Sequence, residues 1–337
     1  MVGGQELMVG GQEQEMEGRG ARVLLKARPL LAQLVDRMAS PAPDGMELYI
    51  HEADVGEADW LETLAARFAR FAWPPGFTWI VEGPVWSLDG ELFGICRNAE
   101  VDRELTRRLV RLAVHLGAVA VNVHCVDGSP DPHVLNETRR TAALEQAVPY
   151  LEWYVRLCSD AGLVPLVENV PPICRMRREA FIYTPIGVEP RDLLACVRSV
   201  PGLGLTLDTS HAQLAVNALR GATGDAGTGP NAGTVAPSIG DLSRAASYYQ
   251  GLDGPHSLEA FIAPLLEAIV SVHVSNAAGL LDEGLPYEIG DADLDAAVLQ
   301  LSDAARYFVT EPLDPDEDHA VRKREMQARL RALLQGR

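Results

Sequence analysis

Five short apolar runs of the chain each end in a side chain that can ligate a metal ion or transfer a proton. In chain order these side chains are His124, Glu168, Asp208, His273 and Glu311. A further imidazole, His211, follows three residues after Asp208. Carboxylates and imidazoles are common general acids and bases, and both ligate divalent cations. One such residue after an apolar run is ordinarily a surface residue or a helix cap, but its repetition over five runs indicates a polar catalytic or metal site.

Three carboxylates that share one pocket need a compensating positive charge. Like charges at short range raise one another's pKa values, and burial adds a desolvation cost to each. Glu168, Asp208 and Glu311 offer oxygens and His273 adds a nitrogen. This donor set is harder than the Cys and His ligands of structural zinc. We therefore expect these four residues to ligate one divalent ion, with Mn²⁺ favoured and Mg²⁺, Co²⁺ or Zn²⁺ as alternatives.

The elements that must position these residues follow one alternating pattern. Short β-branched apolar runs predict strands at 22–25, 46–50, 77–81, 118–124, 163–168, 202–208, 269–273 and 307–311. Longer segments with apolar residues three and four apart predict helices between them, such as 58–71, 101–116, 141–161 and 192–200. Eight such units predict a (β/α)₈ TIM barrel of the α/β class rather than an open sheet, and the carboxyl ends of barrel strands converge on one mouth.

The barrel is expected to occupy residues 21–337 as a single domain. Residues 1–20 contain MVGGQE twice, and Gly takes positions that a coiled coil would fill with apolar side chains, so we expect a disordered leader there. Residues 220–240 lie between the sixth and seventh expected strands and are rich in Gly, Ala, Thr and Pro. Such a composition buries little apolar surface, so we expect a flexible insert that is either a lid or a tolerated insertion.

Composition and charge narrow the class of partner. The chain has 337 residues, with 29 Lys and Arg against 47 Asp and Glu, and a formal net charge of −18. An acidic surface repels phosphate, so we expect no nucleic-acid partner. The sequence has neither an apolar stretch of spanning length nor a secretory signal, so we expect no membrane association. Its five cysteines form no CxxC pair, which favours a reducing cytoplasm.

At these residues the chain resembles the xylose isomerase-like TIM-barrel superfamily, which includes sugar isomerases and epimerases, inosose dehydratases and apurinic-site endonucleases. The resemblance covers roughly half of the chain, from the fourth to the eighth expected strand. Its matching segments are LVPLVENVPP (163–172), LGLTLDTSHA (203–212), VSVHVSNAAG (270–279), LPYEIGDADLD (285–295) and VTEP (309–312). The DTSHA segment, followed by a further strand-end His and a Glu on the last strand, is typical of the superfamily rather than of one of its reactions.

The resemblance implies an activity and a set of roles. Ketose 3-epimerase-like members bind one metal through positions that match Glu168, Asp208, His273 and Glu311. Their chemistry is proton abstraction beside a carbonyl through an enediolate, with the residues matching Glu168 and Glu311 as base and acid. The histidine matching His211 contacts substrate oxygens. We also expect substrate contacts from His124, which alternatively ligates a second metal or pairs with a carboxylate, and from two residues at the rim of the pocket, Glu82 and His51.

The leading interpretation is thus a metal-dependent isomerase or epimerase of a small sugar or polyol, phosphorylated or not, that forms a homodimer or homotetramer. An inosose dehydratase-like lyase on the same scaffold is the first alternative. An apurinic endonuclease-like phosphodiesterase is disfavoured, because Glu82 stands where the endonucleases carry a histidine and residues 280–289 contain none. The last alternative is a non-catalytic binding protein with a relict site, against which the intact pair Glu168 and Glu311 argues.

Overall fold

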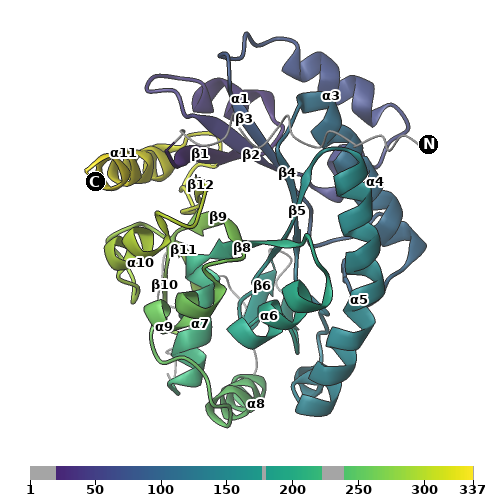
Figure 1. Cartoon of the computed structure of the whole chain (residues 1–337), viewed down its shortest axis with the longest axis vertical. Helices are drawn as coiled ribbons and strands as arrows, with labels where there is room; N and C mark the ends of the chain where they lie inside the picture. The colour runs from purple at the N-terminus through teal and green to yellow at the C-terminus, as the bar shows by residue number, and fades with distance from the viewer. Residues whose placement is uncertain (1–19, 177–179, 222–238, 337) are drawn as a thin grey trace, which may run out of the picture.

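Eight parallel strands close into a barrel in the computed structural model, which describes residues 20–176, 180–221 and 239–336 (Figure 1). The strands are β1 (Arg22–Ala27), β2 (Gly45–Tyr49), β3 (Thr78–Glu82), β4 (Ala120–His124), β5 (Val164–Glu168), β8 (Gly204–Asp208), β9 (Ile269–Val274) and β12 (Tyr307–Thr310). They are ordered β1-β12-β9-β8-β5-β4-β3-β2 around the barrel. The predicted (β/α)₈ barrel is confirmed, and each predicted strand lies within two residues of the observed one.

Helices follow most strands and cover the outside of the barrel (Figure 1). They are α1 (Leu31–Arg37), α2 (Glu52–Val55), α3 (Trp60–Phe68), α4 (Glu100–Leu116), α5 (Glu137–Asp160), α6 (Pro190–Ser199), α7 (Thr209–Leu219), α8 (Ile239–Gln250), α9 (Leu258–Ile262), α10 (Leu294–Leu301) and α11 (Val321–Gln335), with 3₁₀ turns η1 (Pro132–Val134) and η2 (Ala263–Leu265). Helix α4 shows why they form: Leu105, Leu109 and Leu112 bury one face. It ends where Gly117 adopts a left-handed φ of 63°.

The barrel interior changes from apolar to polar within one layer of side chains. Its inner apolar cluster consists of Leu24, Ile80, Ala120, Leu166 and Val309. Side chains two residues apart on a strand share one face. The residue two positions after each apolar one therefore also faces inward, one layer nearer the carboxyl end of the strand. Those residues are Lys26, Glu82, Asn122, Glu168 and Glu311. The strand register therefore places a polar layer directly on top of the apolar one, at the end of the barrel where sites form.

Two short antiparallel hairpins lie in the loops that follow barrel strands β5 and β9. The first pairs β6 (Ile173–Met176) with β7 (Ala180–Tyr183) after β5, and the second pairs β10 (Asn276–Ala278) with β11 (Asp282–Leu285) after β9. Neither hairpin was predicted, because strands of three or four residues are too short to show alternation in the sequence.

The two expected irregular segments fall largely outside the described residues. Residues 1–19 of the predicted leader and residues 222–238 of the predicted insert lie outside the described residues. The last two residues assigned to the insert, 239 and 240, instead begin α8. None of the helices within 20–176, 180–221 and 239–336 combines the length and apolar character that crossing a bilayer requires.

Candidate metal and catalytic site

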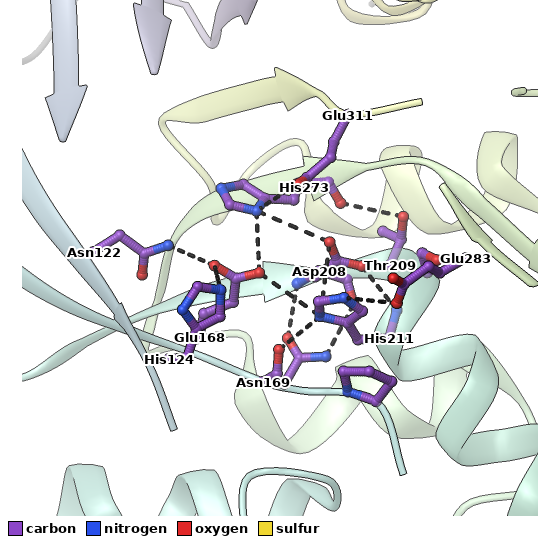
Figure 2. Close-up of polar contacts among 12 residues, drawn as sticks. Asn122, His124, Glu168, Asn169, Asp208, Thr209, His211, His273, Glu283 and Glu311 are labelled. Carbon is purple, nitrogen blue, oxygen red and sulfur yellow. Dashed lines mark hydrogen bonds and ion pairs between the residues drawn. The ribbon is translucent and has the colours of Figure 1, made fainter. Parts of the chain in front are cut away.

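Four side chains from four neighbouring barrel strands meet at the carboxyl ends of those strands (Figure 2). They are Glu168 of β5, Asp208 of β8, His273 of β9 and Glu311 directly after β12. One ligand atom of each lies within 4.8 Å of the others. His273 Nδ1 is 2.7 Å from Glu311 Oε2, 3.2 Å from Glu168 Oε1 and 3.9 Å from Asp208 Oδ2. The structure thus brings together the four residues that the sequence predicts as ligands.

The donor atoms of this cluster fit a divalent cation. His273 Nδ1 and Glu311 Oε2 are buried, and neither has a hydrogen-bond partner of suitable geometry among the described residues. Buried polar atoms are normally satisfied, so orphaned donor and acceptor atoms that share one space indicate a missing partner. Three carboxylates and one imidazole form a hard donor set with few protein ligands, which suits a cation that keeps positions open for substrate.

Burial and neighbouring charges shift the pKa values of the ligands in different directions. Burial raises the pKa of Asp208 to about 7, and the nearby charge of His211 offsets only part of this effect. Burial would lower the pKa of His273, but the charges of Glu168 and Glu47 outweigh burial and raise it well above its usual value. The three carboxylates therefore require a positive charge at this point, on the imidazole or on a bound cation.

Glu168 offers its two carboxylate oxygens to different neighbours. Its Oε2 accepts a hydrogen bond from Asn122 Nδ2 at 2.6 Å, while Oε1 lies 3.2 Å from His273 Nδ1 and 3.7 Å from His211 Nδ1. Burial raises the pKa of Glu168, but the charges of His273 and His124 outweigh it and lower the pKa to about 2. Because the Asn122 amide holds Glu168 Oε2 by its hydrogen bond, Glu168 Oε1 is directed toward His273 and the other cluster residues.

Lys26 is a site residue that the sequence analysis missed. It lies in β1, and its Nζ contacts Glu311 Oε1 and, at 2.6 Å, Glu82 Oε2. Burial lowers the pKa of Lys26, but the charges of Glu311 and Glu82 outweigh burial and raise it well above its usual value. The predicted strand 22–25 ended one residue before Lys26. The two-residue alternation from Leu24 could have found it, because it places Lys26 on the same inner face.

His211 lies in the first turn of α7 and faces both the cluster and the second hairpin. Its Nδ1 is 2.9 Å from the backbone oxygen of Asn169, and its Nε2 is 3.6 Å from Glu283 Oε2 on β11. Burial would lower the pKa of His211, but Asp208 and Glu283 outweigh it and raise the pKa to about 10. Glu283 was not predicted as a site residue, because the strands of its hairpin are too short to show a pattern in the sequence.

Two of the predicted substrate contacts lie on the Glu168 side of the cluster. His124 Nε2 is 3.5 Å from Glu82 Oε1 and 4.0 Å from Glu168 Oε2. Burial lowers the pKa of His124 to about 4, so this imidazole is neutral near pH 7. Burial also raises the pKa of Glu82 well above its usual value. These two residues thus form a buried polar pair beside a predicted ligand.

The third predicted contact, His51, is the residue between β2 and α2 that caps the start of α2. Its backbone N–H donates to Asp54 Oδ2 at 2.8 Å. Its ring lies edge-on to Tyr49 with 5.0 Å between the ring centroids, and the Tyr49 ring is in turn 5.6 Å from Lys26 Nζ. His51 is therefore connected to the site through Tyr49, and its role in substrate binding stays a prediction.

Comparisons with known proteins agree with this architecture. A family model described as a xylose isomerase-like TIM barrel matches residues 37–332. No curated protein sequence gives a significant match. Among solved structures, a D-tagatose 3-epimerase-like protein is 15% identical with a TM-score of 0.60, covering 94% of this chain and 98% of that one. The 3-keto-D-glucoside 4-epimerase YcjR from E. coli is 14% identical with a TM-score of 0.57, covering 93% and 99%. Endonuclease IV from Thermus thermophilus is 17% identical with a TM-score of 0.52, covering 94% and 100%. Identities this low show a shared fold.

Proposed function

Because the chain belongs to the xylose isomerase-like TIM-barrel family, we propose that it is a divalent-metal-dependent isomerase or epimerase that acts on a sugar or polyol. The observation that carries the proposal is the placement of two carboxylates around one imidazole nitrogen. Glu311 Oε2 and Glu168 Oε1 lie 2.7 and 3.2 Å from His273 Nδ1. A protein that only binds its ligand has no need of paired groups for acid and base chemistry. The similar folds of the D-tagatose 3-epimerase-like protein and of the 3-keto-D-glucoside 4-epimerase agree with this proposal.

In this proposal Glu168, Asp208, His273 and Glu311 hold the ion, and two of them also move protons. When bound, a divalent cation supplies a Lewis acid that polarises the substrate carbonyl and stabilises the negative charge of an enediolate. Glu168 takes the proton from the carbon beside the carbonyl, and the electron pair of that C–H bond moves toward the carbonyl oxygen. Glu311 donates a proton to the opposite face of the same carbon, which inverts it; this role requires Glu311 to be protonated in the substrate complex, and exchange with water afterwards removes the proton from Glu168 and returns one to Glu311. Proton return to the former carbonyl carbon would instead interconvert an aldose and a ketose.

The base role of Glu168 depends on the charge of its neighbours. Its pKa of about 2 reflects the positive charge of His273 more than that of His124. An imidazole must lose its ligating proton before it binds a cation. A bound cation would take the place of this positive charge, so Glu168 would stay ionised and able to accept a proton. The same cation would make the C–H bond beside the substrate carbonyl more acidic.

The remaining polar side chains are proposed to bind substrate hydroxyl groups. His211, with a pKa raised to about 10, is a hydrogen-bond donor at neutral pH. On the other side of the cluster, neutral His124 can donate or accept a hydrogen bond, and the Glu82 carboxylate beside Lys26 can accept one. The site therefore offers hydrogen bonds on two sides of the proposed reacting carbon, which would orient a polyhydroxylated substrate.

Deuterium incorporation from heavy water tests the proposed reaction directly. A mixed pool of ketoses, aldoses, their phosphates and inososes is incubated with the Mn²⁺-supplied protein and analysed by mass spectrometry. We expect one substrate to gain one deuteron, and we expect the gain to disappear in chelated protein and in Glu168→Gln and Glu311→Gln. The exposed Glu152 on α5 gives the matched control, Glu152→Gln, which should behave as the wild type.

The same experiment separates the alternatives. Deuterium gain coupled to loss of water would assign the protein to the inosose dehydratase-like class instead. If the protein binds one ion tightly but no compound exchanges a proton, the proposed isomerase activity is wrong.

A further inference from the structure

His273 is held on its far side by a carboxylate from another part of the barrel. Its Nε2 lies 2.6 Å from Glu47 Oε2, and both side chains are 0% exposed. Glu47 belongs to β2 and His273 to β9, and the barrel order places β12 and β1 between these strands. The contact therefore reaches across the barrel interior. We propose that Glu47 is a positioning residue that orients His273 as a ligand of the metal centre.

The two ring nitrogens of His273 face different partners. Nδ1 faces the carboxylates of the candidate metal centre, and Nε2 faces Glu47. A neutral imidazole carries one N–H and one lone pair, whereas an ionised carboxylate only accepts hydrogen bonds. Glu47 therefore selects the tautomer with its proton on Nε2, which leaves the lone pair of Nδ1 for a cation. A carboxylate in this position also fixes the ring orientation and makes the ligating nitrogen more basic.

A packing role alone does not account for Glu47. Its Oε1 is buried, and no described group donates a hydrogen bond to that oxygen. Ligand atoms of Glu47, Glu82 and His273 also lie within 4.8 Å of one another, so a second carboxylate is close. An apolar side chain of similar volume would avoid the cost of burying a carboxylate beside another one. The position of Glu47 is explained if His273 needs a fixed acceptor at Nε2.

The positioning role rests on the proposed function, because it requires a metal centre. Calorimetric titration of the chelator-treated protein with Mn²⁺ tests it by measuring the affinity for the ion. Glu47→Leu removes both the charge and the acceptor, so we expect Mn²⁺ to bind about 100-fold more weakly. Glu47→Gln keeps the size of the side chain and an acceptor oxygen, so we expect a loss of about 10-fold. The isosteric glutamine variant keeps the test decisive if the leucine variant does not fold.

The matched control changes a different buried carboxylate. Asp192 on α6 accepts a hydrogen bond from Arg140 Nε at 2.6 Å and does not belong to any of the possible metal groups found among the described residues. Asp192→Asn should therefore bind Mn²⁺ as the wild type does. An equal loss of affinity in this control would show that the Glu47 effect is a general consequence of disturbing the protein, and would overturn the inference.

The Nε2 proton of His273 provides a readout that is independent of activity. In protein loaded with diamagnetic Zn²⁺ and carrying ¹⁵N-labelled histidine, this proton should resonate far downfield and exchange slowly with water, because a buried carboxylate accepts it. In Glu47→Leu we expect an upfield shift and faster exchange. A purely structural role of Glu47 would leave no reason for both the NMR signal and the metal affinity to change together.

The outcomes distinguish this inference from the proposed function. Equal Mn²⁺ affinities in the wild type and both Glu47 variants would overturn the positioning role and leave the metal-dependent function standing. A wild-type protein that binds no divalent ion would overturn the metal centre itself, and the positioning role with it.

Discussion

Asp208 Oδ1 accepts a hydrogen bond from the backbone N–H of His211 at 2.8 Å, so Asp208 caps the start of α7. The same carboxylate belongs to the candidate metal centre. The backbone N–H of Asp208 donates to Asn169 Oδ1 at 2.7 Å, which connects the end of β8 to the residue after β5. A helix cap fixes the direction of its side chain. The start of α7 therefore positions a predicted ligand and the imidazole of His211 together.

Substitutions of Asp208 should separate helix capping from metal binding. Asn caps a helix about as well as Asp, whereas Ala does not. We expect Asp208→Asn to be more stable than Asp208→Ala by about 1 kcal/mol in chelator-treated protein, measured by urea unfolding. Both variants should lose Mn²⁺ affinity, because neither retains a carboxylate. Equal stabilities of the two variants would contradict the capping role.

Metal binding should release protons. The pKa of His273 is raised well above its usual value by Glu168 and Glu47 despite burial, and burial raises that of Asp208 to about 7. A cation needs both groups deprotonated, so it competes with protons, and its affinity should rise with pH. We expect clearly tighter Mn²⁺ binding at about pH 8 than at about pH 6. Calorimetric titration in buffers of different ionisation enthalpy counts the protons, and zero release near neutral pH would be incompatible with this picture.

Loss of Lys26 should destabilise the protein. Its ammonium contacts Glu311 and Glu82, and its side chain is only 11% exposed. Lys26→Met leaves two buried carboxylates without this cation, which we expect to lower the free energy of unfolding by about 3 kcal/mol in chelator-treated protein. Adding Glu82→Gln removes one of those charges and should restore part of the loss. Urea unfolding of the single and double variants measures the coupling, and strictly additive effects would argue against it.

Glu283 should affect substrate binding through His211. Together with Asp208 it raises the pKa of His211 to about 10 against the effect of burial. Glu283→Gln removes one negative charge, so the pKa of His211 should fall, which ¹⁵N NMR titration measures. With the proposed substrate, KM should rise several-fold while kcat changes less, since His211 binds oxygens rather than moving the reacting proton. The exposed Glu288, in the turn that follows β11, gives the control, Glu288→Gln, which should change neither the pKa of His211 nor KM.

The barrel fold and the convergence of the four candidate ligands could be predicted from local sequence patterns. The alternation of β-branched runs with helical segments is a local property, so it predicted each barrel strand without knowledge of its neighbours. Each of the four lies within one residue of the end of a strand, where a polar residue interrupts an apolar run: Glu168, Asp208, His273 and Glu311. A barrel of parallel strands places the carboxyl ends of all its strands at one mouth, so the convergence of these four side chains could be predicted from the fold class.

Contacts between strands far apart in the chain determine which other side chains join the site. Lys26 reaches Glu311 because closure pairs β1 with β12 at opposite ends of the chain, and Glu47 reaches His273 across 226 residues of sequence. Both residues lie within predicted strands or at their edges, where a charged residue ordinarily indicates a solvent-facing position. Glu283 comes from a hairpin too short to show a pattern. Local periodicity indicates which face of a strand a residue occupies. Barrel closure and the loops at the barrel mouth determine which residues of different strands come into contact, and a local sequence pattern does not contain that information.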